Sequence, residues 1–121
     1  MKERGREATD HAADRAFALG LAHLRAQQHF AAHEELEAAW RTAPPAERAF
    51  LQGLVHVAVA WHHALHGNRT GCERQLEKAQ RRLAAYAPAH RGVDVASLLR
   101  QIEAARVAVA AGDLSLAPVR V

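Results

Sequence analysis

Cysteine is almost absent from this chain of 121 residues, which has one, Cys72. A single cysteine excludes a disulfide framework and a CxxC-type metal site within the chain. Cys72 falls on an apolar stripe at helical spacing, which predicts a small buried core residue. No N-terminal apolar segment resembles a signal peptide, so we expect a cytoplasmic protein.

Aromatic residues are also few. They make up 5% of the chain, although 50% of its residues are hydrophobic. The core must therefore consist mainly of Ala, Leu and Val, and Ala has the highest helix propensity. The β-branched and aromatic residues that favour strands form no alternating runs. We predict an all-α protein, and the length fits one domain.

Lysine occurs only at Lys2 and Lys78, and the net charge of +3 comes from 16 basic and 13 acidic residues. Most basic residues alternate with acidic ones, which is typical of a solvated mixed surface and argues against a nucleic-acid partner. The longest apolar stretch, residues 51–65, is interrupted by a glutamine and three histidines. It therefore does not predict a membrane span.

Helical periodicity, caps and prolines together predict five helices in a compact bundle over residues 9–112. A charged flexible tail over residues 1–8 is expected before them, and a C-terminal tail over 113–121 after them. The third helix is the longest and poorest in charge, so we expect it to be central. The expected helices span roughly residues 9–27, 30–42, 46–66, 68–87 and 94–112.

The expected second helix carries the pattern His33-Glu34-x-x-Glu37-x-x-Trp40. At about 100° per residue, His33, Glu37 and Trp40 share one core-facing stripe, whereas Glu34 lies off it. A histidine paired with a carboxylate could perform acid–base chemistry, bind a divalent metal, or serve only as a polar pair that fixes helix packing. The pattern is not HExxH, so the signature of zinc proteases is incomplete.

On the expected third helix Gln52, His56 and His63 share a second stripe. This stripe lacks the Lys, Arg and Glu of an ordinary exposed face, so we predict that it meets the polar face of the second helix. The alternative is a stripe that faces solvent. If the two faces meet, a Zn²⁺-like ion would use His33, Glu37 and either His56 or His63. The remaining histidines are expected to be exposed or are given no role: His11, His23, His29, His62, His66 and His90.

The order and spacing of these residues resemble a small bacterial and archaeal family, domain of unknown function 309. The resemblance spans about residues 17–100 and departs at His56, where the family usually has Gln. It implies a bundle of about five helices around the third, one arrangement that joins His33, Glu34, Glu37, Trp40, Gln52, His63 and Asn68, and no established activity. The matching segments are Ala32-His33-Glu34-Glu35-Leu36-Glu37-Ala38-Ala39-Trp40, Phe50-Leu51-Gln52-Gly53-Leu54, His63-Ala64-Leu65-His66-Gly67-Asn68, Gly71-Cys72 and Arg91-Gly92-Val93-Asp94.

Two classes of function remain open. We favour a module that binds a small ligand or a protein partner, with the polar residues as a structural network. The alternative is a hydrolase-like enzyme that uses His33, Glu37 and one of His56 and His63, with Glu34 as general base. A pocket that reaches the His33–Glu37 pair would favour the enzyme, and a separate apolar surface would favour the module. Either is compatible with a homo-oligomer.

Overall fold

The computed structural model describes residues 2–121, with side chains from residue 10 onward, and it is all-α as predicted. Within this range there is no strand, and His90 and Val93 form an isolated antiparallel bridge. None of these helices has an apolar stretch long enough to cross a membrane. The elements are α1 (Lys2–Arg25), α2 (His29–Arg41), α3 (Pro45–Leu65), α4 (Arg69–Leu83), the 3₁₀ helix η1 (Ala84–Tyr86) and α5 (Val95–Ala110).

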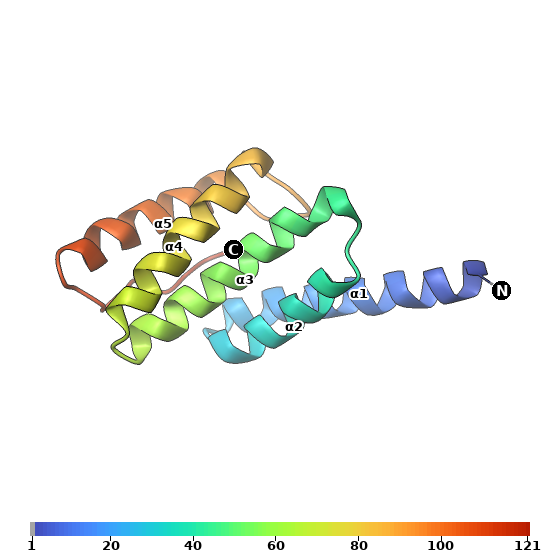
Figure 1. Ribbon diagram of the computed structural model, residues 1–121, viewed down its shortest axis with the longest axis horizontal. Coiled ribbons are helices and arrows are strands. Elements are labelled where there is room, and N and C mark those ends of the chain that lie inside the picture. The colour runs from blue at the N-terminus through green and yellow to red at the C-terminus, as the bar shows by residue number, and fades with distance from the viewer. Residues whose placement is uncertain (1) are drawn as a thin grey trace.

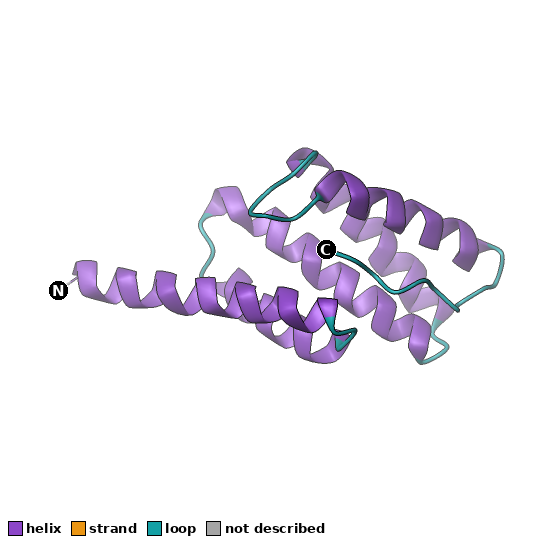
Figure 2. Ribbon diagram, turned by 180° about the vertical axis from the view of Figure 1, so that it is seen from behind, coloured by secondary structure: helices purple, strands orange, loops and turns teal. Residues whose placement is uncertain are grey.

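Each helix packs mainly against the next one along the chain, so that α1 contacts α2, α2 contacts α3, α3 contacts α4 and α4 contacts α5. Figure 1 shows α3 between the α1–α2 pair and the α4–α5 pair. Seen from behind in Figure 2, the C-terminal segment returns across the bundle from the end of α5. With 24 residues, α1 is longer than α3, which has 21, so the expectation that the third helix is the longest is wrong.

The helix ends follow from local backbone chemistry. Pro45 occupies the first turn of α3, where a missing N–H costs nothing. Gly67 adopts a positive φ of 71° immediately after α3, a conformation that favours glycine. Asn68 and Asp94 cap α4 and α5 because their side chains accept hydrogen bonds from the N–H groups of Gly71 and Ser97.

The first helix differs most from expectation. We expected it to begin at Thr9 or Asp10, after a flexible tail over residues 1–8, but α1 begins at Lys2. Residue 1 of that expected tail lies outside the described residues. Glu, Arg and Ala, which dominate residues 2–8, have high helix propensities, and their charge does not prevent helix formation.

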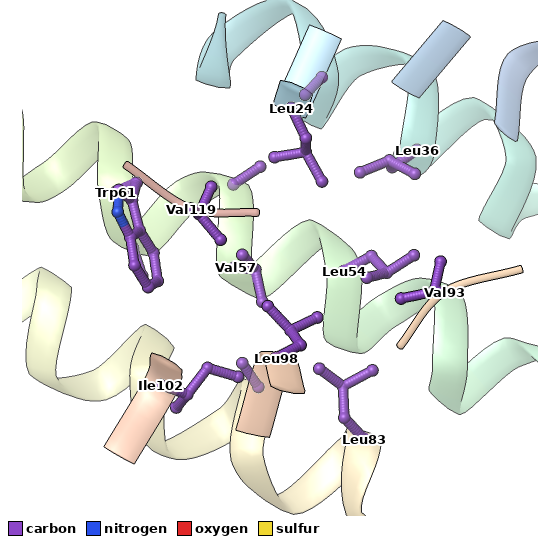
Figure 3. Packing of buried hydrophobic residues seen from close by; sticks show 14 of the residues in the cluster. Leu24, Leu36, Leu54, Val57, Trp61, Leu83, Val93, Leu98, Ile102 and Val119 are labelled. Carbon is purple, nitrogen blue, oxygen red and sulfur yellow. The ribbon is translucent and has the colours of Figure 1, made fainter. Parts of the chain in front are cut away.

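The core is built on both sides of α3 (Figure 3). Leu54 and Val57 of α3 are fully buried, with Leu24 and Leu36 on one side and Leu98 on the other. Cys72 is also fully buried, which confirms its predicted place in the core. Full burial of one such aliphatic side chain contributes about 1.5–3 kcal/mol to stability. The two helix pairs are therefore joined through α3.

Two glycines allow adjacent helices to approach closely. A Cβ atom on Gly20 would lie 2.6 Å from Cγ of Leu36, and a Cβ on Gly53 would lie 2.6 Å from Cγ of Leu83. Side chains at these positions would push α1 away from α2 and α3 away from α4. The glycine of the Leu-Gln-Gly segment is thus explained by helix packing.

The C-terminal residues 113–121, expected as a tail, are packed against the bundle. Val119 is fully buried. Trp61 Nε1 donates to the carbonyl of Ala117 at 2.9 Å, and Gln27 Nε2 donates to that of Val119 at 3.0 Å. Gln101 exchanges two hydrogen bonds with the backbone of Arg120, both at 2.8 Å. This segment therefore ties together the turn between α1 and α2, α3 and α5.

Candidate functional site

The polar pair predicted on α2 is present. His33 Nε2 lies 3.2 Å from Glu37 Oε2, and the two side chains are 27% and 38% exposed. Glu34 is exposed, as its position off the stripe implied. Trp40 is half-buried under the Arg48 guanidinium, which lies 4.7 Å from its ring centroid, and its buried Nε1 has no hydrogen-bond partner among the described residues.

The polar stripe of α3 does not meet α2. His56 Nδ1 lies 2.7 Å from Gln75 Oε1 of α4, and Asn68 Nδ2 donates to His63 Nδ1 at 3.3 Å. Gln52 is half-buried, and its side chain has no hydrogen bond within residues 10–121. The expected hydrogen bonds from His33 and Glu37 to Gln52, His56 or His63 are therefore wrong. The stripe lies on the side of α3 that α4 covers.

Helix geometry explains this error. His56 and His62 are six residues apart, which places them about 120° apart around the axis of α3. His56 turns toward α4, whereas His62 turns toward α2, where it lines a small cavity with His33. Helical spacing gives the angle between these two side chains, but not which neighbouring helix each one faces.

The pKa of His56 is lower than that of an ordinary histidine, which favours its neutral form. Burial lowers the pKa of His56, and the charges of Lys78, Arg81 and Arg82 lower it further, whereas the hydrogen bond that its Nδ1–H donates to Gln75 Oε1 raises it. A neutral imidazole bonded to a side-chain amide acts much as a glutamine would. His56 thus forms a hydrogen bond that joins α3 to α4.

His63, Gly67, Asn68 and Gly71 form one structural unit between α3 and α4. Asn68 caps α4 through Gly71 N–H at 2.9 Å and also binds His63. A Cβ on Gly71 would lie 2.6 Å from Asn68 Nδ2 and 2.9 Å from His63 Cδ2. Only glycine leaves room for this arrangement. The His-x-x-x-Gly-Asn-x-x-Gly pattern is therefore accounted for by the connection between two helices.

Two histidines given no role in the sequence analysis lie between α2 and α3. His29, Phe30, His33, Val59 and His62 line a cavity of about 140 Å³. Burial lowers the pKa of His29, and the nearby charge of His62 lowers it further. The i,i+4 spacing of His29 with His33 and of His62 with His66 was the signal in the sequence that could have found this cluster.

Metal ligands do not converge in the arrangement that the sequence suggested. Among the described residues, no group of three or more His, Cys, Asp or Glu side chains is placed to hold a metal ion. His33 and Glu37 are together, but His63 is bound to Asn68 at the start of α4. The structure therefore does not assemble the expected set of His33, Glu37 and either His56 or His63.

His90, also given no role, belongs to a polar network at the other end of α3. Its Nε2 lies 2.7 Å and 3.0 Å from the two carboxylate oxygens of Glu47. Arg91 contacts Asp14 at 3.2 Å and Glu47 at 3.8 Å. These contacts hold the loop before α5 against α1 and α3. The network is separated from the His33–Glu37 pair in sequence and was not visible from helical spacing.

A broad concave surface lies between α5 and the C-terminal segment. We name it the α5 groove; its volume is about 860 Å³, and none of its lining residues is acidic. Two arginines, Arg100 and Arg120, are exposed beside it, and neither forms an ion pair within residues 10–121. The full lining is Trp61, Ser97, Arg100, Gln101, Ala104, Ala105, Ala108, Ser115, Leu116, Ala117, Pro118 and Arg120.

Fold and site together define a small all-helical protein with separate polar clusters and a groove beside α5. Residues 17–75 match the model of the family described as domain of unknown function (DUF309). The resemblance based on the motifs is thus confirmed. No curated protein and no solved structure matches the chain. The matched residues include α2, α3 and the start of α4, whereas α5 and the C-terminal segment lie beyond them.

Proposed function

We propose that this protein is a non-catalytic binding module whose ligand-binding surface is the α5 groove. Its size is within the range of small-molecule sites, which is about 300–1,000 Å³. Alanines and Leu116 make much of the lining apolar, and Trp61 contributes an aromatic ring. Such a lining with a few polar groups is typical of ligand sites.

The single observation that carries the proposal is the charge of the groove. Arg100 and Arg120 supply two guanidinium groups, and the lining contains no carboxylate that would neutralise them. Gln101 bonds to the backbone of Arg120, so the two arginines belong to the same part of the groove. Guanidinium groups bind carboxylates with paired hydrogen bonds. The matching ligand is a small carboxylate with an apolar body.

The hydrolase-like alternative has weaker support. The cavity that reaches His33 has a volume of about 140 Å³, and it is lined by Phe30 and Val59 with three imidazoles and no carboxylate. Glu34, the candidate general base, is exposed on a different side of the helix from the His33–Glu37 pair. His56 and His63 are hydrogen-bonded to Gln75 and Asn68.

An NMR titration with two probes of equal chain length tests the proposal. Octanoate should shift backbone amide signals of α5 and residues 113–121 in a saturable way, whereas octylammonium should not, because the groove is cationic. The Arg100→Ala/Arg120→Ala double variant should lose the octanoate response. Arg41→Ala, which removes an exposed arginine of α2, is the matched control and should keep it.

Either of two results would contradict the proposal. One is an equal response to both probes, which would mean that the surface recognises alkyl chains without regard to charge. The other is an octanoate response that the double variant retains. The double variant should leave the free energy of unfolding within about 0.5 kcal/mol of the parent, since both arginines are exposed.

A further inference from the structure

The C-terminal end of α3 carries two histidines that the groove does not use. His62 lies in the last turn of α3, and His66 is its C-cap residue. Residues four apart on a helix project from the same face. Their rings are adjacent here, with centroids 4.2 Å apart and an angle of 37° between the ring planes.

Hydrogen bonding leaves the metal-binding nitrogens of this pair available. His66 Nδ1 lies 2.8 Å from the carbonyl oxygen of His62, so it donates its proton there and its Nε2 keeps a lone pair. Such a bond from the second ring nitrogen is the usual way in which proteins orient a metal-binding histidine. The ring of His62 has no hydrogen-bond partner among the described residues. His66 is exposed and His62 half-buried, so solvent reaches the pair.

The surroundings also favour a cation. The end of α3 presents carbonyl groups, and a helix C-terminus carries a partial negative charge of about half a unit. Imidazole nitrogens bind Zn²⁺ at about 2.0–2.1 Å, and the ring centroids of His62 and His66 lie 4.2 Å apart.

We propose that His62 and His66 form a two-histidine site for a late divalent transition-metal ion, with water as the remaining ligands. The affinity of a site with two imidazoles for divalent first-row metal ions follows the general order for such ions, so Cu²⁺ should bind most tightly and Zn²⁺ less tightly. His33 is not a ligand, because its Nε2 is paired with Glu37. The ring of Phe30 lies beside the rings of both His33 and His62, with centroid distances of 5.7 Å to each. The site uses neither His63, which is bound to Asn68, nor the α5 groove.

A Cu²⁺ titration of the full chain without a purification tag tests this site. Substoichiometric Cu²⁺ should broaden the ring signals of His62 and His66 together in carbon–proton NMR spectra, before those of any other histidine. His62→Ala and His66→Ala should each weaken Cu²⁺ affinity in calorimetry by roughly tenfold or more, because each removes one arm of a chelate. His11→Ala, an exposed histidine of α1, and His33→Ala should bind as the parent does.

The folded state of each variant is checked by its circular dichroism and amide spectrum. His66 is exposed, so His66→Ala carries the test even if the half-buried His62 proves necessary for folding. Cu²⁺ affinity that His66→Ala leaves unchanged would overturn the proposal. So would first broadening of other histidine rings, or a loss of affinity in His33→Ala equal to that in His66→Ala.

Discussion

Two surfaces of this bundle differ in how far their polar side chains are committed to the fold. On the motif side, which we define as α2, α3 and the first turn of α4, His56, His63 and Asn68 bond to neighbouring side chains or backbone. In the α5 groove, Arg100 and Arg120 form no ion pair within residues 10–121. Residues of the sequence motifs can thus stabilise the fold, whereas the arginines without an ion pair lie in the α5 groove.

The comparison depends first on whether the C-terminal segment is part of the fold. Val119→Ala should lower the free energy of unfolding by about 2 kcal/mol, because Val119 is fully buried and its methyl groups fill the core. Val107→Ala is the matched control: Val107 is 64% exposed, so its truncation should cost less than about 0.5 kcal/mol. Urea denaturation measures both. Equal effects would mean that residues 113–121 do not form a fixed wall of the groove.

On the motif side the strongest expected effect is at Gly53. Replacement of a helical glycine by alanine ordinarily stabilises a helix by about 0.5–1 kcal/mol. Gly53→Ala should instead destabilise by about 1–2 kcal/mol, since the new Cβ would overlap the side chain of Leu83. Chemical denaturation of Gly53→Ala, Leu83→Ala and the double variant forms a cycle, and the clash should disappear in the double variant. Stabilisation by Gly53→Ala would show that α3 and α4 are further apart.

Asn68 separates an architectural role from a functional one. Asn68→Ala should cost about 1 kcal/mol, because α4 loses its N-cap and His63 loses its hydrogen bond. Asn68→Asp keeps the capping acceptor and should recover most of the loss. Glu34→Ala, which removes an exposed carboxylate from the same pattern, should leave thermal stability unchanged. A larger loss for Glu34→Ala than for Asn68→Ala would reverse the assignment of roles.

The His33–Glu37 pair should contribute little to stability. Both side chains are partly exposed, so solvent screens the attraction, and an i,i+4 pair on a helix surface contributes about 0.3–0.5 kcal/mol. A double-mutant cycle of His33→Ala and Glu37→Gln measures the coupling free energy. A coupling several times larger would place the pair in a more enclosed site than its exposure indicates.

The smallest effect at alkaline pH is expected for His56→Gln, which should change stability by less than about 0.5 kcal/mol near pH 8. Its pH dependence should differ from that of the parent. Because burial lowers the folded-state pKa of His56, the unfolded chain binds the proton more readily. The contribution of neutral His56 to the free energy of unfolding is fully present above the unfolded-state pKa of 6.5. It is lost as the pH falls toward the lower pKa of the folded state.

His56→Gln should therefore lose less stability than the parent between about pH 8 and pH 5, as measured by urea denaturation at each pH. His29 and His62, whose pKa values are also lowered by burial, should keep part of the dependence in the variant. His11→Gln changes an exposed histidine and serves as the control. Parallel pH profiles for the parent and His56→Gln would contradict the buried pairing with Gln75.

Much of the fold could be predicted because its signals are local. Capping side chains at Asn68 and Asp94 and the glycine at Gly67 act within one turn of the chain. The pairing of His33 with Glu37 followed from helical spacing alone. The contacts of His56, His63 and His90 could not be predicted in this way, since each depends on which helix or loop covers it.

By itself, the sequence determined an all-α bundle and the direction in which each side chain leaves its helix, because propensity and the 3.6-residue period are properties of the local backbone. Only the tertiary structure decided what those side chains meet. The rotation of α3 between α2 and α4 directs His56 toward Gln75 and His62 toward the cavity beside His33. The return of residues 113–121 along α5 created the groove, since a groove needs two walls that the chain brings together only on folding.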